Sequence, residues 1–211
     1  MKIEFVKKYF QTYMHESRVT SVSMQGNLIA SGSDDTLAQV WNMQTQTKLW
    51  QFEHEDEVYC LLFHENLLIS CSQDKSTRVW NLANGKQIHR LDQSSRCKNF
   101  DISPDKSLLA IASSDDLVLF DFSRTTKIEE FKLGYSLNDV KFNRSGTRLL
   151  AGSHKGQVFK IDMFFDSEDD DEYDRYIEYD RSISEKKSSP SKDSERLKIF
   201  RKLFKKTSKE N

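Results

Sequence analysis

The sequence of 211 residues predicts an all-β fold of about four similar sheets, each with four short antiparallel strands. Three observations lead to this prediction: a repeat of about forty residues, short runs rich in β-branched and aromatic residues, and turn residues between those runs. One four-stranded unit cannot bury its own apolar face. The units are therefore expected to stack around a common axis.

The repeat is clearest in two segments that end in Trp-Asn. Residues 28–42 read LIASGSDDTLAQVWN, and residues 67–81 read LLISCSQDKSTRVWN. Weaker copies cover 109–121 and 149–162 and end in Phe-Asp and Ile-Asp. The four anchors are 39, 40 and 41 residues apart, and they are Trp41, Trp80, Phe120 and Ile161. Such regular spacing indicates a repeat architecture.

The second unit shows how each repeat divides into strands. Its predicted strands are 58–63, 67–71, 77–81 and 87–91. Residues that favour turns separate these runs, and Asn84-Gly85 is a strong hairpin signal because both residues tolerate positive φ. Each unit is therefore expected to be a four-stranded antiparallel meander.

These segments resemble the WD40 repeat of the WD-repeat β-propeller family, over about residues 5–165. The resemblance implies a β-propeller of about four blades, with repeats at about 15–53, 54–92, 93–132 and 133–165. It also implies a buried hydrogen-bonded tetrad in a complete blade. The matching residues are His15, Ser33, Asp35 and Trp41 in the first unit and His54, Ser72, Asp74 and Trp80 in the second. The later units depart from the pattern, because Phe120 and Ile161 replace Trp and Lys155 replaces the turn Asp.

The first residues of the chain look like a strand without a blade. Residues 5–13 align with the outer strand that precedes the second unit, whereas the fourth unit supplies only three strands. We therefore expect the N-terminal strand 5–13 to close the last blade. Three arrangements are open: a closed four-blade ring, an open arc that pairs with a second copy into eight blades, or an incomplete propeller that needs a larger partner.

Charge is distributed unevenly after residue 165. Acidic and basic residues balance within 1–165, and the whole chain carries a formal net charge of −1, which excludes a globally basic nucleic-acid binder. Residues 166–193 are first acidic and then polar, so they are predicted to form a disordered linker. Residues 194–211 are basic and predict an amphipathic helix or a disordered tail. The apolar residues at helical spacing are Leu197, Phe200, Leu203 and Phe204.

The sequence shows no constellation for catalysis, for a cofactor or for a metal ion. The five histidines form no metal-binding pair, and Cys60, Cys71 and Cys97 form no close pair. We therefore expect a protein that is not an enzyme. The odd number of cysteines favours a reducing compartment, and no segment resembles a secretory signal or a membrane span. An intracellular location, cytoplasmic or nuclear, is expected.

The predicted function is that of a non-enzymatic scaffold or adaptor. The resemblance implies that protein or peptide partners bind the propeller face formed by loops that enter the first strand and leave the second. The candidate residues on that face are Glu16, Arg18, Glu55, Glu57, Lys75, Arg96, Tyr135, His154 and Lys155. Tyr135 is the leading candidate, because aromatic residues are enriched at interaction hot spots. The alternative function is binding to an anionic membrane or a nucleic acid through the basic segment 194–209.

Overall fold

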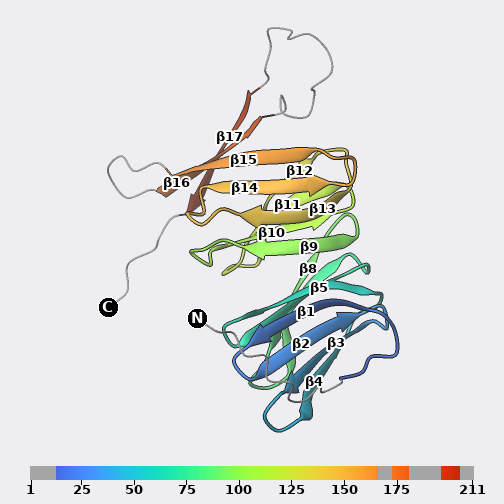
Figure 1. The fold of residues 1–211 in the computed structure, drawn as a ribbon. Helices are drawn as coiled ribbons and strands as arrows, with labels where there is room; N and C mark the ends of the chain where they lie inside the picture. Colours follow the sequence, from blue (N-terminus) through green and yellow to red (C-terminus); the bar gives the residue numbers. More distant parts are fainter. Residues whose placement is uncertain (1–12, 166–172, 181–195, 205–211) are drawn as a thin grey trace, which may run out of the picture.

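The computed structural model describes residues 13–165, 173–180 and 196–204, and these residues form strands joined by turns (Figure 1). Three sheets each contain four strands. Blade 1 consists of β1 (Val19–Gln25), β2 (Leu28–Ser33), β3 (Leu37–Asn42) and β4 (Thr47–Glu53). Blade 2 consists of β5 (Val58–His64), β6 (Leu67–Ser72), β7 (Ser76–Asn81) and β8 (Lys86–Asp92). Blade 3 consists of β9 (Cys97–Ile102), β10 (Leu108–Ser113), β11 (Asp116–Asp121) and β12 (Thr126–Lys132).

The fourth sheet has five strands and follows the same antiparallel order. Blade 4 consists of β13 (Leu137–Phe142), β14 (Arg148–Ser153), β15 (Val158–Phe165), β16 (Tyr173–Asp180) and β17 (Arg196–Phe204). Within every blade, consecutive strands pair along the chain. The all-β fold of repeated four-stranded units that the sequence predicts is therefore confirmed.

Each blade repeats the same local irregularity at the start of its first strand. The pairing register shifts between Val19 and Ser21 in blade 1 and between Val58 and Cys60 in blade 2. A β-bulge of this kind increases the local twist of a strand. Stronger twist suits sheets that pack face to face around an axis rather than lying flat.

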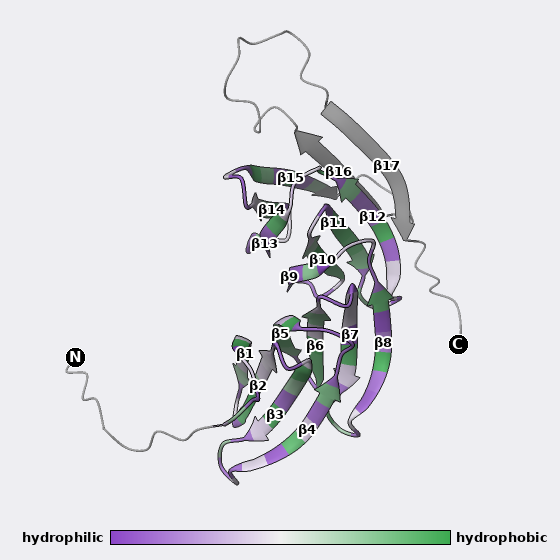
Figure 2. Cartoon of the chain, turned by 90° about the vertical axis from the view of Figure 1, so that its right-hand side faces the viewer, coloured by the Kyte–Doolittle hydropathy of each residue, from purple (hydrophilic) through white to green (hydrophobic). Residues whose placement is uncertain are grey.

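The core lies between neighbouring blades. Ala30 and Val40 of blade 1 share one apolar cluster with Leu61, Leu68 and Trp80 of blade 2. Equivalent clusters join blades 2 and 3 and blades 3 and 4. The strands β6 and β10 are largely apolar, whereas the outer strands β4, β8 and β12 are banded with polar residues (Figure 2). Each blade is thus stabilised by its neighbours rather than by its own sheet alone.

The four blades form an open arc and not a closed ring (Figures 1 and 2). The innermost strands contact each other in chain order, β1 with β5, β5 with β9 and β9 with β13. Blades 1 and 4 lie at opposite ends of the arc in both views. Of the three arrangements that the sequence leaves open, the closed four-blade ring is not the one that this chain adopts.

The end of the predicted N-terminal strand lies at blade 1 and not at blade 4. Residues 5–12 fall outside the described residues, but Tyr13 packs on Trp41 with ring centroids 5.0 Å apart. The outer position beside β15 is occupied by β16. Chain connectivity explains the difference, because a strand that follows β15 directly closes a much shorter loop than one from the far end of the arc.

The tail also differs from the prediction. Part of the segment 166–193, predicted to be a disordered linker, forms β16, and residues 196–204 form the strand β17 where an amphipathic helix or a disordered tail was predicted. The apolar residues of this segment fit period two as well as period 3.6, since Leu197, Ile199 and Leu203 alternate with other residues. Pairing with β16 selects the strand, and its register places Glu178 opposite Lys198 and Asp180 opposite Arg196.

Candidate functional site

A buried hydrogen-bond network organises blade 2. His54 Nδ1 lies 2.9 Å from Asp74 Oδ2, and His54 Nε2 lies 2.8 Å from Ser70 Oγ. Trp80 Nε1 donates to the same Ser70 hydroxyl at 2.8 Å. The network joins the loop before β5, the strand β6, the β6–β7 turn and the strand β7. It therefore fixes the loops at this end of the blade, because each buried polar group has a partner.

Blade 1 contains a smaller version of this network. His15 Nδ1 lies 2.8 Å from Asp35 Oδ2, and His15 Nε2 lies 2.7 Å from Ser31 Oγ. The indole nitrogen of Trp41 is buried and has no hydrogen-bond partner among the described residues. The first network therefore joins three side chains where the second joins four.

The serines of both networks differ from the predicted ones. Ser31 and Ser70 take part, whereas Ser33 Oγ accepts from the backbone of Asp35 and Ser72 Oγ accepts from the backbone of Asp74. Residues two apart on a strand point to the same face, so spacing alone does not separate the two serines. The position of the histidine ring decides which serine it bonds, because the Nε2 atoms of His15 and His54 lie beside Ser31 and Ser70.

Burial and hydrogen bonding set the charge state of the blade 2 network. Burial lowers the pKa of His54 below its ordinary value, and the nearby Asp74 opposes this effect only in part. Burial would raise the pKa of Asp74, but hydrogen bonds from His54, Ser76 and the Glu55 backbone outweigh it and lower that pKa. A neutral imidazole beside an ionised carboxylate is the favoured state near neutral pH.

The loop face carries the predicted candidate residues, and most of them have partners there. Arg18 Nε donates to Asp34 Oδ2 at 2.9 Å, and Glu55 forms ion pairs with Arg78 and Arg90. Tyr135 is half-buried against Phe159, with Lys155 Nζ 5.9 Å from the ring centroid. The other candidate side chains are Glu16, Lys75, Arg96 and His154, which are exposed, and Glu57, which is half-buried.

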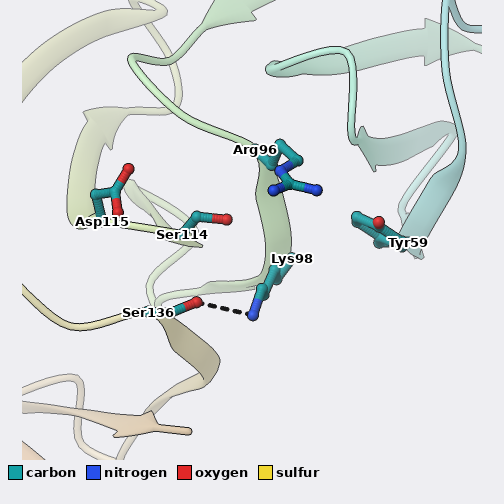
Figure 3. Close-up of a pocket in the computed structure, with 6 residues that line it drawn as sticks. All are labelled: Tyr59, Arg96, Lys98, Ser114, Asp115 and Ser136. Carbon is teal, nitrogen blue, oxygen red and sulfur yellow. Dashed lines mark hydrogen bonds between the residues drawn. The ribbon is translucent and has the colours of Figure 1, made fainter.

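A pocket of about 270 Å³ opens on the inner side of the arc (Figure 3). Its lining comes from three blades and consists of Tyr59, Arg96, Lys98, Ser114, Asp115 and Ser136. A second hollow of about 380 Å³ shares Tyr59 and Lys98 with it and extends to Arg18. The first strands β5 and β9 bring these residues together, because the innermost strands line the concave side of the arc.

The two cations of the pocket are held by neutral oxygen atoms. Lys98 Nζ donates to Ser136 Oγ at 2.9 Å and to Asn138 Oδ1 at 3.1 Å. Arg96 Nη1 donates to Gln73 Oε1 at 3.0 Å. No carboxylate of the described residues forms an ion pair with either cation. Both positive charges therefore remain available to an anionic ligand.

Tyr59 lies across the pocket from Ser114 and Asp115 (Figure 3). Its hydroxyl donates to Gln73 Oε1 at 2.6 Å, the atom that also accepts from Arg96. Burial, followed by the neighbouring Glu57, raises the pKa of this phenol above its ordinary value, so the ring stays neutral. Gln73 thus positions an aromatic ring and a guanidinium side by side.

Sequence reasoning placed only Arg96 of these lining residues among the candidates. It missed Tyr59, which lies inside the predicted strand 58–63, and Lys98, which lies in β9 rather than in a loop. The available signal was their position in the repeat. The second residue of each innermost strand is Thr20, Tyr59, Lys98 or Asn138. Ser114, Asp115 and Ser136 lie in adjoining turns.

The comparisons with known proteins agree with the repeat and the fold. The profile of the family "WD domain, G-beta repeat" (WD40) matches residues 7–42 and 46–81. The chain therefore contains two WD40 repeats, over about a third of its length. No curated protein matches its sequence. A similar solved structure is the crystal structure of the computationally designed Ika4 protein, with a TM-score of 0.64 and 21% sequence identity. The match covers 71% of this chain and 94% of the designed chain, and it supports the propeller-type fold alone.

WD40 repeats in general act as scaffolds for protein–protein interaction and are typically not enzymes. The described part of this WD40-repeat protein contains no group of three or more His, Cys, Asp or Glu residues arranged to hold a metal ion. The same residues contain no helix with the length and apolar character needed to cross a bilayer. The candidate site among the described residues is the cationic pocket at Arg96 and Lys98.

Proposed function

We propose that this WD40-repeat protein is a non-enzymatic interaction scaffold that binds an acidic segment of a protein partner in the pocket at Arg96 and Lys98. The observation that carries the proposal is the absence of a carboxylate ion-pair partner for either cation among the described residues. Each cation is held by neutral acceptors, so its charge is positioned without being neutralised.

The surroundings of the pocket support a peptide ligand. Tyr59 offers a half-buried aromatic ring beside the cations, and aromatic and arginine side chains are enriched at hot spots. Ser114 and Ser136 add hydroxyl groups at the opposite wall. The adjoining hollow toward Arg18 lengthens the site to an elongated groove that an extended peptide fits.

A fluorescence polarisation titration tests the proposal. The probe is a fluorescein-labelled peptide of Glu and Asp residues, compared with the same peptide carrying Gln and Asn. The acidic peptide is expected to bind more tightly, and Arg96→Ala or Lys98→Ala is expected to weaken it about tenfold, since a hydrogen bond to a charged group is worth about 1.5–3 kcal/mol. Asp115→Asn is expected to strengthen binding, because it removes a negative charge from the lining.

Lys86→Ala is the matched control, since this exposed lysine lies on the outer strand β8 and away from the pocket. It should leave the affinity unchanged. Equal binding of the neutral peptide, or binding that neither Arg96→Ala nor Lys98→Ala weakens, would contradict the proposed site. Binding that is insensitive to salt would do the same, because exposed charges are screened by added salt.

The alternative function through segment 194–209 rested on a basic amphipathic helix. Residues 196–204 form the strand β17, and binding of the basic segment 194–209 to a membrane or a nucleic acid stays a prediction. No observation on the described residues favours that alternative over the pocket.

A further inference from the structure

The two ends of the arc expose faces that are buried everywhere else in the molecule. The pairing register makes Val22 of blade 1 equivalent to Leu61 of blade 2, because both lie opposite the network serine of the next strand. Met24 is equivalent to Phe63 in the same way. Val22 and Met24 are each 70% exposed, whereas Leu61 and Phe63 are 3% and 7% exposed. The side chains that a preceding blade would cover are therefore uncovered in blade 1.

Blade 4 exposes the face that a following blade would cover. Leu150 is equivalent to Ala30 of blade 1, and Val158 is equivalent to Ala38. Ala30 and Ala38 are fully buried against blade 2, whereas Leu150 is 45% and Val158 is 53% exposed. Lys160, on the same face, has its charge paired with Asp162 at 2.7 Å. Among the described residues, no blade follows blade 4 at this end of the arc.

We propose that two copies of this chain close into an eight-blade ring, with blade 4 of each copy packed on blade 1 of the other. Each exposed face would then meet the type of face that covers its equivalent inside the chain. The interface is continuous with the three blade interfaces already present, since it uses the same strands and the same register positions. The inference does not depend on Arg96, Lys98 or their ligand, and it shares with the site only Val19, which lines the second hollow.

The side chains at the proposed interface are complementary in size. Inside the chain, the small Ala30 shares a cluster with the large Leu61. Between copies, the larger Leu150 would meet the smaller Val22, so the large and the small side chain exchange sides of the interface.

Two equivalent glycines support the same pairing. A Cβ atom at Gly32 would lie 2.7 Å from Val58 Cγ1, so blade 2 packs directly on that backbone. A Cβ atom at Gly152, the same position in blade 4, has no neighbour within 4 Å. Val19 is the blade 1 equivalent of Val58 and is 44% exposed. Val19 of a second copy would fill the space over Gly152 as Val58 fills the space over Gly32.

Sedimentation of the full chain gives the first test. We expect a mass near twice the 24.7 kDa of one chain at micromolar concentration. Val22→Lys and Leu150→Glu should each give folded monomers, because each substitution places an unpaired charge in both copies of the symmetric interface. Mixing the two variants should restore a dimer, since one interface then carries a Lys–Glu pair and the other is unchanged. Ile88→Glu, on the outer strand β8, is the matched control and should remain dimeric.

A cross-link gives the second test. The ideal Cβ of Gly32 lies 3.4 Å from Val58 Cβ, close to the separation of about 3.5–4.5 Å in disulfides. A chain with Val19→Cys and Gly152→Cys should therefore form a covalent dimer on oxidation, and neither single variant should. The control chain with Gly32→Cys and Val58→Cys should link within itself.

Three results would overturn the ring of two copies. The first is a monomeric wild-type chain, which would leave the covering of blade 1 to another segment or another protein. The second is a dimer that persists in both charged variants. The third is an oxidised double-cysteine chain that links within itself or forms a ladder of higher masses, since an open head-to-tail assembly does not close.

Discussion

The indole nitrogen of Trp80 donates to the Ser70 hydroxyl at 2.8 Å, whereas the equivalent nitrogen of Trp41 has no partner among the described residues. The two blades have similar sequences and the same spacing and strand register, yet only blade 2 completes its network. Blade 2 lies between two neighbours and blade 1 has one. The difference places the better-satisfied polar network in the interior of the arc, where an unpaired group costs most.

This contrast predicts unequal effects of the same substitution. Trp80→Phe removes a hydrogen bond and should lower the free energy of unfolding by about 1 kcal/mol more than Trp41→Phe, which removes none. Urea denaturation of the two variants, followed by circular dichroism, measures the difference. Equal losses in the two variants would show that ring size alone, and not the hydrogen bond, accounts for the effect.

Ser70→Ala should be more damaging than Ser31→Ala. It leaves both His54 Nε2 and Trp80 Nε1 without a partner, whereas Ser31→Ala affects only His15 Nε2. A buried polar group that loses its partner costs about 1–3 kcal/mol, so the expected difference is about 1–2 kcal/mol. The same urea titration tests it, and a larger loss for Ser31→Ala would contradict the network described here.

Stability should fall as pH is lowered from neutral. Burial lowers the pKa of His54 in the folded state, so the unfolded chain binds a proton more readily and gains stability below the ordinary histidine pKa of 6.5. The lowered pKa of Asp74 acts in the same direction at lower pH, below the ordinary value of 3.8. Urea midpoints between neutral and acidic pH should decrease in wild type. His54→Gln should abolish the part of the decrease near pH 6.5, and an unchanged profile in that variant would contradict this assignment.

The hairpin at Gly85 gives a prediction about backbone and packing together. Gly85 has φ of +68°, and a Cβ atom there would overlap the ring of Trp50. Gly134 has φ of +70° and open space around it, so it is the matched control. Gly134→Ala should cost about 1–2 kcal/mol from the left-handed backbone alone. Gly85→Ala should cost about 1–3 kcal/mol more, because the ring must also move. Thermal denaturation of both variants compares them, and similar midpoints would mean that Trp50 moves freely.

The cysteines should differ in reactivity. Burial and neighbouring thiols raise the pKa of Cys71 well above its ordinary value, whereas a hydrogen bond from Cys71 lowers the pKa of Cys60 despite burial. Cys60 is also only partly buried. Iodoacetamide should therefore modify Cys60 before Cys71 and Cys97, because the thiolate is the reactive form. Peptide mass spectrometry after brief labelling gives the order, with Cys60→Ser as the control, and earlier labelling of Cys71 would contradict it.

The repeat, the strands and the residue types of the polar networks follow from local sequence pattern. Apolar residues that alternate between turn signals specify antiparallel strands, and the spacing from Trp41 to Ile161 specifies four equal units. The histidines and aspartates of the networks are the predicted ones, because their places at loop and turn follow from that spacing. These features depend on local pattern, which a single sequence carries in full.

Three features depend on contacts between distant parts of the chain: the serine that bonds each histidine, the segment beside β15 and the conformation of residues 196–204. Ser31 and Ser33 lie on one strand face, and the segment 196–204 fits two periods, so local pattern leaves each choice open. The pocket likewise depends on tertiary structure, since Tyr59, Arg96 and Ser136 come from three blades. These features depend on packing between blades, because that packing determines which polar groups are buried together and which faces remain uncovered.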